Sequence, residues 1–452
     1  MSLDRLEWTT MVDVVIMAAG CGSRMQSSIP KVLHKIAGLP IIDHVMMAVG
    51  SIIPSNVIVV ISEAIAHHHF GNAKAIIQNV QDGTAGAVRL AIPYLTSENV
   101  VVVCGDSPLL DTQHLGELLA SNADAAIIAT ELPPHLRHMP YGRVITEDGK
   151  FLRIVELRDA SELEVACDLI NTGVYKFKTS LLKELIHKVA KSKTTGEYHL
   201  PDVLETAQLL GKVVDVVVSS DYESFHGVNT MSDLAFAESI MQRRMRNKHM
   251  EAGVKMLDPQ STFLSHDTKI ASGVVVEQNV VIGTGVKIMD RAIIKSFSYL
   301  EDCEVGEGVH VGPFARIRGE SKLQNGSAIG NFVEVKGSII GANAKAKHLA
   351  YLGDALIGRH TNIGAGTVIC NYDGVNKHTT NIGDDVFVGS NTTLVAPLDI
   401  GTRSILAAGS TITASVAPDS LAIARSAQDT IRDGAKRVWA KKGRSHHRNT
   451  DF

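Results

Sequence analysis

The spacing of apolar residues divides the chain into two parts. Up to about residue 228, short apolar runs alternate with stretches in which apolar residues recur every three or four positions. The short runs predict buried strands at Val12–Ala18, Val57–Ile61, Val100–Cys104, Ala125–Ala129 and Val213–Val218. The longer stretches predict helices at Ile41–Val49, Ala85–Ala91 and Leu181–Val189. This alternation predicts an α/β domain with a mainly parallel sheet, helices on both faces, and ligands at the carboxyl ends of the strands.

From about residue 264 the apolar period becomes six. Apolar residues recur in phase at Val305, Val311, Ile317, Leu323, Ile329 and Val335, at Ile357, Ile363 and Ile369, and at Ile382, Val388, Leu394, Ile400, Leu406 and Ile412. Such hexapeptide repeats predict a left-handed parallel β-helix, in which three short strands and their turns close one triangular coil. The segment Asn371–Thr380 interrupts the phase, so we expect it to bulge outward as a loop.

A helical segment separates the two parts. Residues 232–252 suit one helix, with Ser232 as the expected N-cap and Gly253 as the expected terminator. Its apolar face would carry Leu234, Ala237, Met241 and Met245. A basic amphipathic helix can also bind membranes, but its place beside a change of architecture favours a linker. We therefore predict an α/β domain over residues 1–230, a linker helix over 231–253, and the β-helix with a C-terminal tail over 254–452.

The composition narrows the possible function classes. Hydrophobic residues make up 45% and charged residues 20%, as in ordinary soluble proteins. The net charge is −4, whereas a general nucleic-acid binder is usually basic. The five cysteines lie far apart without a CxxC pair, which argues against a disulfide framework or a zinc site. Neither a leader-like start nor a long apolar run is present, so we expect a cytoplasmic protein without a membrane span.

Residues suited to phosphate chemistry follow the first predicted strand. The sequence VVIMAAGCGSRMQSSIPK leads from the strand into Gly20 and Gly22, and then to Arg24 and Lys31. Glycines after a strand let backbone amides approach phosphate oxygens, and basic side chains neutralise phosphate charge. The alternative, a dinucleotide-binding motif, needs a third glycine where Met25 stands, and a helix directly after it. A polar stretch follows instead, so that alternative is disfavoured.

The longer motif AAGxGxRM…PKVLH…AG resembles the signature of sugar-phosphate nucleotidyltransferases, and PKVLHKIAGLP closely resembles the N-acetylglucosamine-1-phosphate uridylyltransferases. Further matches come in order, at IIQNVQDGTAGA, Cys104-Gly105-Asp106, Tyr141-Gly142-Arg143, Ile154-Val155-Glu156, Ile170-Asn171-Thr172-Gly173 and Gly227-Val228-Asn229. The resemblance implies a Rossmann-like nucleotidyltransferase domain that joins N-acetylglucosamine-1-phosphate to the uridylyl group of UTP and releases pyrophosphate.

The same resemblance implies residue roles. Lys31 and Arg24 would meet the phosphates as catalytic residues, and Asp106 with Asn229 would bind Mg²⁺. The sugar part would contact Gly142, Glu156, Asn171 and Thr172. The full set expected to bind UTP or UDP-N-acetylglucosamine is Met17, Ala18, Ala19, Gly20, Lys31, Gln78, Gly83, Thr84, Cys104, Gly105, Asp106, Gly142, Glu156, Asn171 and Asn229. These residue types fit the chemistry, because positioning and charge neutralisation carry such transfers and Mg²⁺ prefers oxygen ligands.

A second ordered set of motifs lies on the predicted β-helix. Its members are Gly312–Arg318, Asn331–Lys336, His348–Asp354, Asn362–Thr367 and Cys370–Gly374. They resemble the glucosamine-1-phosphate acetyltransferase half of the same bifunctional family, and the whole resemblance extends from about residue 12 to residue 425. A histidine with a pKa near 6.5 suits a general base that deprotonates an amine before it attacks a thioester. His348 matches this base.

The resemblance also assigns the remaining residues of the acetyltransferase half. Glucosamine-1-phosphate would contact Arg318, Lys336, Tyr351 and Asn362. Acetyl-CoA would contact Ala365, Asn371, Tyr372, Ser390, Ala408 and Arg425. The small residues in the second set fit close backbone approach by the pantetheine arm.

Together the two halves imply bifunctional synthesis of UDP-N-acetylglucosamine for peptidoglycan and lipopolysaccharide. The implied partners are small molecules: UTP, glucosamine-1-phosphate, N-acetylglucosamine-1-phosphate and acetyl-CoA. The resemblance further implies a homotrimer formed through the β-helix. Two alternatives are a monofunctional sugar-1-phosphate nucleotidyltransferase with a structural β-helix and a non-catalytic sugar-nucleotide sensor. His348 argues against the first, and the presence of Lys31, Asp106 and Asn229 argues against the second.

Three features depart from the resemblance or lie outside it. Relatives read Arg-Pro-Gly where this chain has Arg318-Gly319-Glu320, which we expect to loosen the turn and to weaken glucosamine-1-phosphate binding. The run His67–His69 suggests a metal cluster, but adjacent residues cannot share one face, so we expect a solvated loop. The basic C-terminal segment AKKGRSHHRN is expected to be a solvated terminus.

Overall fold

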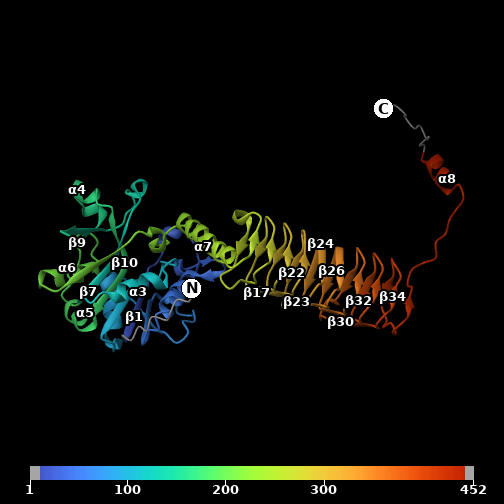
Figure 1. The fold of residues 1–452 in the computed structure, drawn as a ribbon, viewed down its shortest axis with the longest axis horizontal. Coiled ribbons are helices and arrows are strands. Elements are labelled where there is room, and N and C mark those ends of the chain that lie inside the picture. Colours follow the sequence, from blue (N-terminus) through green and yellow to red (C-terminus); the bar gives the residue numbers. More distant parts are fainter. Residues whose placement is uncertain (1–10, 443–452) are drawn as a thin grey trace, which may run out of the picture. The chain divides into compact units, whose positions relative to one another are not determined.

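The computed structural model describes residues 11–442, which form two compact units (Figure 1). One unit runs to Glu251 and also includes Phe263–Asp267, and the other comprises Ala252–Thr262 and the chain from Thr268 onward. The expected linker helix therefore belongs to the first unit by its contacts. Most of the basic C-terminal segment lies outside the described residues.

A nine-stranded sheet forms the centre of the first unit. Seven strands follow the order β11-β7-β10-β6-β1-β4-β5, and the hairpin β8–β9 pairs with β10. β10 runs antiparallel to β6 and β7, whereas the other neighbours along this order are parallel. The strands are β1 (Val12–Ala18), β4 (Asn56–Ile61), β5 (Lys74–Ile77), β6 (Asn99–Cys104), β7 (Ala125–Glu131), β8 (Arg143–Glu147), β9 (Lys150–Val155), β10 (Leu169–Lys178) and β11 (Val214–Ser219).

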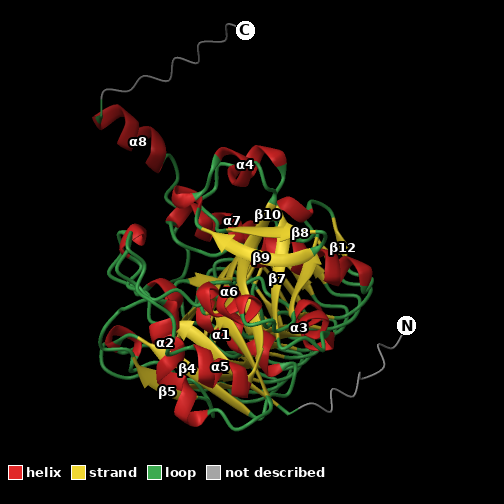
Figure 2. Cartoon of the chain, turned by 90° about the vertical axis from the view of Figure 1, so that its left-hand side faces the viewer, coloured by secondary structure: helices red, strands yellow, loops and turns green. Residues whose placement is uncertain are grey.

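Helices cover both faces of this sheet (Figure 2). Successive strand residues point to opposite faces, so Val15 packs in one core and Val14 and Ile16 in the other. The first core contains α2 (Thr84–Ala91), α5 (Thr179–Leu185) and α6 (Pro201–Leu209); the second contains α1 (Ile41–Gly50) and α3 (Thr112–Ala120). Burial on both faces explains why the strands read as uninterrupted apolar runs. The predicted α/β fold with a mainly parallel sheet is confirmed.

Helix α7 (Met231–Glu251) packs its apolar side on the first unit. Ala237 and Ile240 are buried against a small core, and the predicted apolar residues Leu234, Met241 and Met245 lie against it. The predicted N-cap Ser232 is wrong, because the helix begins one residue earlier. Thr230 and Asp233 cap it reciprocally, each side chain accepting a hydrogen bond from the other's backbone N–H.

Short parallel strands build the second unit, whose coils are coloured yellow to orange in Figure 1. Strand pairs lie one coil apart, as Val275 with Ile293 and Lys345 with Asn362. All of the predicted six-residue apolar positions are buried, which confirms the left-handed parallel β-helix. Between Asn362 and its partner Phe387 the coil is longer, because the segment after Cys370 leaves the ladder as a loop. The predicted interruption is thereby confirmed.

The strands of this region are short. Their bounds are β12 (Lys255–Met256), β13 (Phe263–Leu264), β14 (Lys269–Ile270), β15 (Val275–Val276), β16 (Val281–Ile282), β17 (Val286–Ile288), β18 (Ile293–Ile294), β19 (Tyr299–Leu300), β20 (Cys303–Val305), β21 (His310–Val311), β22 (Arg316–Arg318), β23 (Ser321–Leu323), β24 (Ala328–Lys336), β25 (Ile339–Ile340), β26 (Lys345–Gly353), β27 (Ala355–Ile357), β28 (Asn362–Ile363), β29 (Val368–Cys370), β30 (Thr380–Ile382), β31 (Phe387–Val388), β32 (Thr393–Val395), β33 (Leu398–Ile400), β34 (Ile405–Leu406), β35 (Thr411–Ile412) and β36 (Leu421–Ala422).

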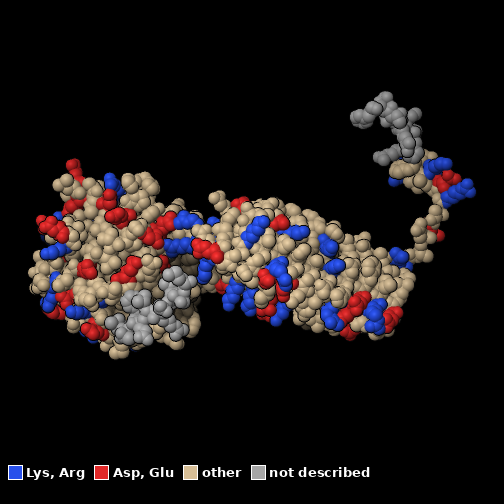
Figure 3. All heavy atoms as spheres, in the orientation of Figure 1, with Lys and Arg blue, Asp and Glu red and all other residues tan. Residues whose placement is uncertain are grey.

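The remaining regular elements are small. They are the two-stranded β2 (Lys35–Ile36) and β3 (Leu39–Pro40), and the helices α4 (Glu162–Val165) and α8 (Gly434–Lys441). Within residues 11–442, no helix combines the length and apolar character needed to cross a bilayer. On the face drawn in Figure 3, basic and acidic side chains are interspersed over both units.

Candidate functional site

The phosphate-binding motif lies at the carboxyl ends of the central strands. β1 ends at Ala18, and the backbone N–H of Gly105, just after β6, donates to the carbonyl of Met17 at 2.9 Å. A Cβ on Gly105 would lie 2.8 Å from the Cβ of Ala18, so only glycine allows this approach of the two strand ends. Gly22 has a positive φ of 62°, and a Cβ there would lie 2.6 Å from that of Lys31. These glycines bring the loop after β1 against Lys31.

Lys31, Asp106 and Asn229 meet at this edge of the sheet. The Lys31 Nζ lies 2.5 Å from Asp106 Oδ2 and 3.2 Å from Asn229 Oδ1. Arg24 Nη2 donates to the same Asn229 oxygen at 2.9 Å. The Lys31 and Asp106 side chains are only 10% and 22% exposed, so the ion pair is shielded from bulk water and its attraction is stronger than at a surface. Four of the predicted phosphate and metal residues are thus in direct contact.

A cavity of about 310 Å³ opens beside Lys31 and Asp106. It is lined by ten of the predicted nucleotide-binding residues: Met17, Ala18, Ala19, Gly20, Lys31, Gln78, Gly83, Thr84, Cys104 and Asp106. The other lining residues, which include Cys21, Gln81 and Glu197, were not predicted from the sequence. Gln81 donates to the carbonyl of Ala19 at 2.9 Å and joins two walls. Gln81 could have been predicted as a lining residue from its place in the motif IIQNVQDGTAGA.

The loop before α2 is held by a second segment of the chain. Gly83 has a φ of 104°, and a Cβ there would lie 2.5 Å from the carbonyl oxygen of Tyr198. The Thr84 hydroxyl accepts a hydrogen bond from the backbone N–H of Leu200 at 2.9 Å. Gln78 donates to Asp82 at 3.0 Å. Glycine and threonine here therefore shape the cavity wall through tight backbone packing.

The predicted sugar-contacting residues gather around a bulge in β10. The pairing of β10 with β7 shifts register between Asn171 and Tyr175, and a β-bulge of this kind redirects side chains. The Asn171 N–H donates to the carbonyl of Gly142, and a Cβ on Gly142 would lie 3.5 Å from Glu156 Oε1. Gly142, Glu156 and Asn171 therefore lie together. Thr172 differs, because it is buried and donates to the Ile128 carbonyl at 2.6 Å, which is a structural role.

Burial raises the pKa of two groups near this site further above neutral pH. Burial raises the pKa of the Cys104 thiol to about 12, with a further contribution from Asp106. Burial likewise raises the pKa of Tyr141 to about 12, with Asp233 and Asp106 adding to it. Both groups are therefore protonated at neutral pH. They can shape the site or donate a hydrogen bond, but they do not add negative charge beside the phosphates.

His348 lies on β26 with a direct hydrogen-bonding partner on β24. The ladder pairs His348 with Asn331, and His348 Nδ1 lies 2.8 Å from Asn331 Oδ1. A carbonyl oxygen only accepts, so Nδ1 is the donor in this hydrogen bond, and in the neutral ring the lone pair is on Nε2. The side chain is exposed, so Nε2 can reach a substrate. Asn331 lies in one of the motifs of the second unit, but its role as the partner of His348 was not predicted from the sequence.

Two ion pairs hold the predicted phosphate-binding cations of the second unit. Arg318 Nε and Nη2 lie 2.8 and 2.7 Å from Glu334 Oε1. Lys336 Nζ lies 3.4 Å from Asp354 Oδ2, and Asn371 donates to the same oxygen at 2.5 Å. The ladder pairs Arg318 with Lys336, so the two cations lie side by side. Asn371 is thus joined to the phosphate-binding side of the site.

Three small residues continue the column that His348 begins. Ala346 pairs with Ile363, Ile363 with Val388, and Val388 with Leu406. The residue two positions after each is His348, Ala365, Ser390 and Ala408 respectively. Backbone hydrogen bonds connect the later coils, from Asn391 N–H to the Ala365 carbonyl and from Gly409 N–H to the Ser390 carbonyl. Arg425 donates to the Ala408 carbonyl at 2.7 Å. Four of the six predicted acetyl-CoA residues, Ala365, Ser390, Ala408 and Arg425, therefore lie along one line.

Comparisons with known proteins show which family the chain resembles. A family model described as a MobA-like NTP transferase domain matches residues 14–146. The chain is 42% identical over 426 residues to the Bifunctional protein GlmU of Paracoccus denitrificans, covering 92% of this chain and 94% of that protein. It is 39% identical to the Bifunctional protein GlmU of Listeria welshimeri, covering 94% and 98% respectively. The chain belongs to the bifunctional GlmU family.

Membership of the GlmU family makes the chain a bifunctional transferase, with nucleotidyltransferase and acetyltransferase activities, that synthesises UDP-N-acetylglucosamine. Its substrates are small molecules of the nucleotide-sugar class. Among solved structures, the inositol-1-phosphate CTP transferase from T. maritima is similar over 50% of this chain and 91% of that chain, at 19% identity and a TM-score of 0.40.

Two features of the second unit concern loops and turns. The exposed Tyr372 donates to the Gly374 carbonyl at 2.6 Å within its own loop. The residues after Arg318 both have positive φ, 68° at Gly319 and 60° at Glu320. Proline cannot adopt such a φ, so this turn differs in backbone conformation from any turn with proline at the first of these positions.

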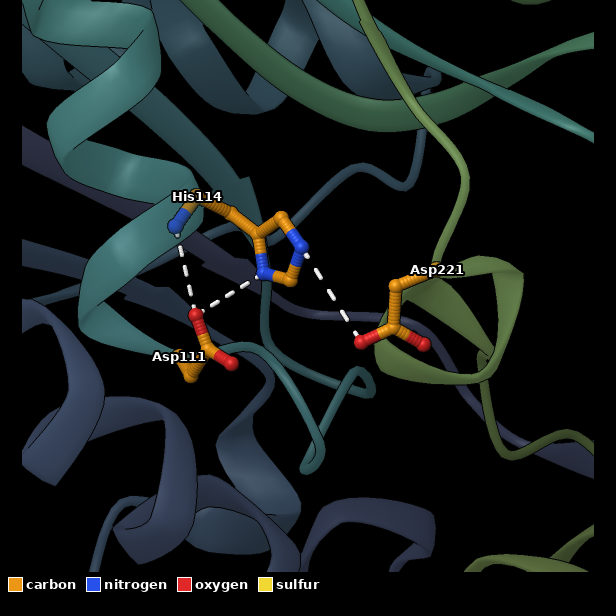
Figure 4. A group of neighbouring side chains, drawn as sticks. All are labelled: Asp111, His114 and Asp221. Atoms are coloured by element: carbon orange, nitrogen blue, oxygen red, sulfur yellow. Dashed lines mark hydrogen bonds and ion pairs between the residues drawn. The ribbon is translucent and has the colours of Figure 1, made fainter.

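Titratable clusters outside the GlmU motifs give one candidate metal group within the described residues. It consists of Asp111, His114 and Asp221 (Figure 4). The run His67–His69 does not form such a group there; it lies in a loop, and His68 Nε2 contacts Asp43 Oδ1 at 2.8 Å. The expected solvated loop is found.

Proposed function

We propose that the first unit transfers the uridylyl group of UTP to N-acetylglucosamine-1-phosphate, and that the second unit first makes this sugar from glucosamine-1-phosphate and acetyl-CoA. The observation that carries the first step is the meeting of Lys31, Asp106 and Asn229 beside the nucleotide-sized cavity. The observation that carries the second is His348, with Nε2 free, at the head of a column of small residues.

In the uridylyl step, an oxygen of the sugar phosphate attacks the α-phosphorus of UTP. The bond from that phosphorus to the bridging oxygen breaks, and pyrophosphate leaves. Lys31 and Arg24 neutralise the phosphate charge that develops in this step, which is the main contribution a protein makes to such transfers. The donor's uracil would lie against Gln78, Gly83 and Thr84.

The oxygens of Asp106 and Asn229 fit a Mg²⁺ ion. Both approach the same Lys31 ammonium, so the two oxygens converge on one positive charge, which supports the proposal. One carboxylate and one amide oxygen, with phosphate oxygens and water, suit this ion. When bound, Mg²⁺ would supply additional neutralisation of the phosphate charge. Lys31 would then turn from Asp106 towards the phosphates.

In the acetyl step, the sugar amine nitrogen attacks the thioester carbon and the carbon–sulfur bond breaks. His348 Nε2 accepts the amine proton, which can then protonate the departing CoA sulfur. Arg318 and Lys336 bind the sugar phosphate, held in place by Glu334 and Asp354. Tyr351 and Asn362 contact the glucosamine. The hydrogen bond between Nδ1 and Asn331 holds the ring in place and leaves Nε2 as the basic nitrogen.

Acetyl-CoA would lie along the small-residue column. Neighbouring strands lie about 4.8 Å apart, so the three steps from His348 to Ala408 span about 14 Å. A thioester at His348 would place the pantetheine arm along Ala365 and Ser390, with the nucleotide end near Arg425. Asn371 and Tyr372, from the loop beside β29, would close over the reacting groups.

We further propose a cytoplasmic homotrimer assembled through the β-helix. The face formed by β25, β27, β30 and β33 carries a shallow groove whose exposed apolar members include Ile339 and Leu356. Leu356 on this face is 47% exposed. Apolar surface of this kind favours association between copies. Light scattering on the purified chain tests the proposal, and a monomer mass would refute it.

One reaction tests both activities. Purified protein receives glucosamine-1-phosphate, acetyl-CoA, UTP and Mg²⁺, and products are identified by mass spectrometry. UDP-N-acetylglucosamine with free CoA and pyrophosphate is expected. His348→Ala should stop acetylation while supplied N-acetylglucosamine-1-phosphate still yields the UDP-sugar, and Asp106→Asn should do the reverse. If the parent protein releases no CoA, the second unit is a structural β-helix and the monofunctional alternative holds.

A further inference from the structure

The two oxygens proposed to bind Mg²⁺ come from loops far apart in sequence. Asp106 lies in the segment 105–111 between β6 and α3, and Asn229 lies in the segment 220–230 between β11 and α7. One direct backbone hydrogen bond joins these segments near the site, from Val228 N–H to the Asp106 carbonyl at 2.9 Å. The distance between the two segments therefore also depends on the side-chain contacts that join them.

A polar cluster connects the far ends of the same two segments. His114 is buried, and its Nδ1 lies 2.8 Å from Asp111 Oδ1 (Figure 4). Its Nε2 points to Asp221, at 4.0 Å from Oδ2. Asp111 also caps helix α3 by accepting from the His114 backbone N–H. The His114 ring packs edge-on against Phe225, with centroids 4.7 Å apart.

Arg244 on α7 completes the connection. Its Nη1 donates to the carbonyl of Leu109 at 2.7 Å, and its Nη2 donates to the Ser224 hydroxyl at 2.6 Å. The same Nη2 lies 3.4 Å from Asp221 Oδ2, and Ser224 donates to that oxygen at 2.5 Å. One planar guanidinium thus contacts both segments at once, a geometry that a lysine ammonium does not reproduce.

The cluster is better explained as a brace than as a metal site. Asp221 already has Arg244 and the Ser224 hydroxyl as partners, and His114 Nδ1 faces Asp111. A further cation would therefore meet the positive charge of Arg244 and compete with His114 for Asp111. Arg244 contacts Leu109 on one segment and Ser224 and Asp221 on the other, so its removal would release both segments.

We propose that Arg244 is a positioning residue for the uridylyl step, holding the segments that carry Asp106 and Asn229 at the separation one divalent cation requires. The inference rests on the proposed Mg²⁺ site. It also gives α7 a role in the first unit beyond covering its small apolar core.

Charge and geometry predict opposite effects when Arg244 is removed. Taking a positive charge from the neighbourhood of a cation site strengthens cation binding by Coulomb's law. Loss of a residue that orients the ligands weakens it, typically by 10- to 100-fold. A weaker site in Arg244→Ala is therefore evidence of positioning, because electrostatics alone would change the affinity the other way.

The experiment measures binding of Mn²⁺ alone to the full chain, by electron paramagnetic resonance of the free ion. Mn²⁺ accepts the same oxygen ligands as Mg²⁺. The variants are Arg244→Ala, Arg244→Lys and the control Arg243→Ala. Arg243 is the neighbouring cation on α7 and pairs with Glu223, on the segment 220–230 alone. Acetyl transfer by the same samples reports whether the rest of the chain is intact.

We expect Arg244→Ala to weaken Mn²⁺ binding about tenfold, Arg244→Lys to be intermediate, and Arg243→Ala to match the parent, with acetyl transfer equal in all. Unchanged or tighter binding in Arg244→Ala would overturn the inference. The reference variant Asp106→Asn tests the proposed metal site separately from the positioning role of Arg244. If the parent binds Mn²⁺ no better than Asp106→Asn, the proposed metal site fails, whatever Arg244 does.

Discussion

Glu320 offers a direct test of the turn beside Arg318. Its backbone lies in the left-handed region, with a φ of 60°. Its N–H donates to the carbonyl of Asp302 at 2.7 Å and to the same residue's Oδ2 at 3.0 Å, which fixes the conformation. The perturbation is Glu320→Gly, which keeps the turn and removes the Cβ.

Two opposing terms set the size of the effect. A non-glycine residue in the left-handed region costs about 1–2 kcal/mol. Glycine also lowers the free energy of unfolding by about 0.5–1 kcal/mol, because the unfolded chain gains conformational freedom. The net expectation is a stabilisation of about 0.5–1 kcal/mol, or roughly 2 °C in melting temperature for a unit of this size. The charge matters less: for an assumed separation of about 8 Å in water, Coulomb's law gives about 0.5 kcal/mol for a unit charge, or roughly twofold in phosphate binding.

Three variants separate backbone from charge. Glu320→Gly removes both the strain and the charge, Glu320→Gln removes the charge alone, and Glu320→Asn removes the charge with a residue that tolerates this region. Residual acetyl transfer after heating reports the second unit, and uridylyl transfer reports the first as a control. We expect heat resistance in the order Gly, Asn, Gln, with Gln equal to the parent.

The KM for glucosamine-1-phosphate should fall by no more than about twofold in all three variants. The reasoning is refuted if Glu320→Gly melts below the parent, or if Glu320→Gln stabilises as much as Glu320→Gly. Equal KM values in parent and variants would instead remove Glu320 as a cause of weak phosphate binding.

Three further outcomes follow from the geometry. In Gly353→Ala, the new Cβ would lie 2.6 Å from the Tyr351 hydroxyl, so the ring must rotate. The KM for glucosamine-1-phosphate should then rise roughly fivefold, for one hydrogen bond of about 1 kcal/mol, while uridylyl transfer is unchanged. Iodoacetamide at pH 8 should label the exposed Cys21 and spare Cys104, whose pKa burial raises to about 12; peptide mass spectrometry reads the labels, and equal labelling would contradict the burial argument. Burial alone would lower the pKa of His114, but the neighbouring carboxylates raise it above its ordinary value. A raised pKa gives stability that is complete below about pH 6.5 and is lost as the pH rises through the folded-state value. Urea unfolding at pH 6 and pH 8.5 should therefore show a loss of stability in the parent that His114→Gln lacks.

The β-helix could be predicted because its rule is local. One apolar residue every six positions is enough to mark the inward side chain of each strand, and all of the marked positions are buried. The loop after Cys370 was visible for the same reason, since it breaks the phase. The parallel strands of the first unit were equally readable, because burial on both faces leaves uninterrupted apolar runs such as Val12–Ala18.

What the sequence did not predict depends on contacts between distant segments. β10 is antiparallel and bulged, and its apolar pattern is interrupted by Asn171, Thr172 and Gly173, so it did not read as a strand. The cap of α7 was assigned to Ser232 because serine is a common cap, whereas the reciprocal Thr230 and Asp233 pair is a stronger arrangement. The partners of Arg244 lie 135 and 20 residues away, and no local pattern announces them.

The two units also differ in how sequence spacing becomes a site. In the first, glycines and loops bring residues together singly, so each depends on its own neighbours. In the second, residues at the same position of successive coils are aligned, whatever the number of residues between them along the chain. The loop between Cys370 and Thr380 lengthens one coil, yet Ile363 still pairs with Val388. Ala365 and Ser390, two positions after each of these residues, therefore stay in the same column. An insertion at that corner therefore adds a loop whose residues, such as Asn371, can reach the reacting groups. The acetyl-CoA column keeps its alignment with His348.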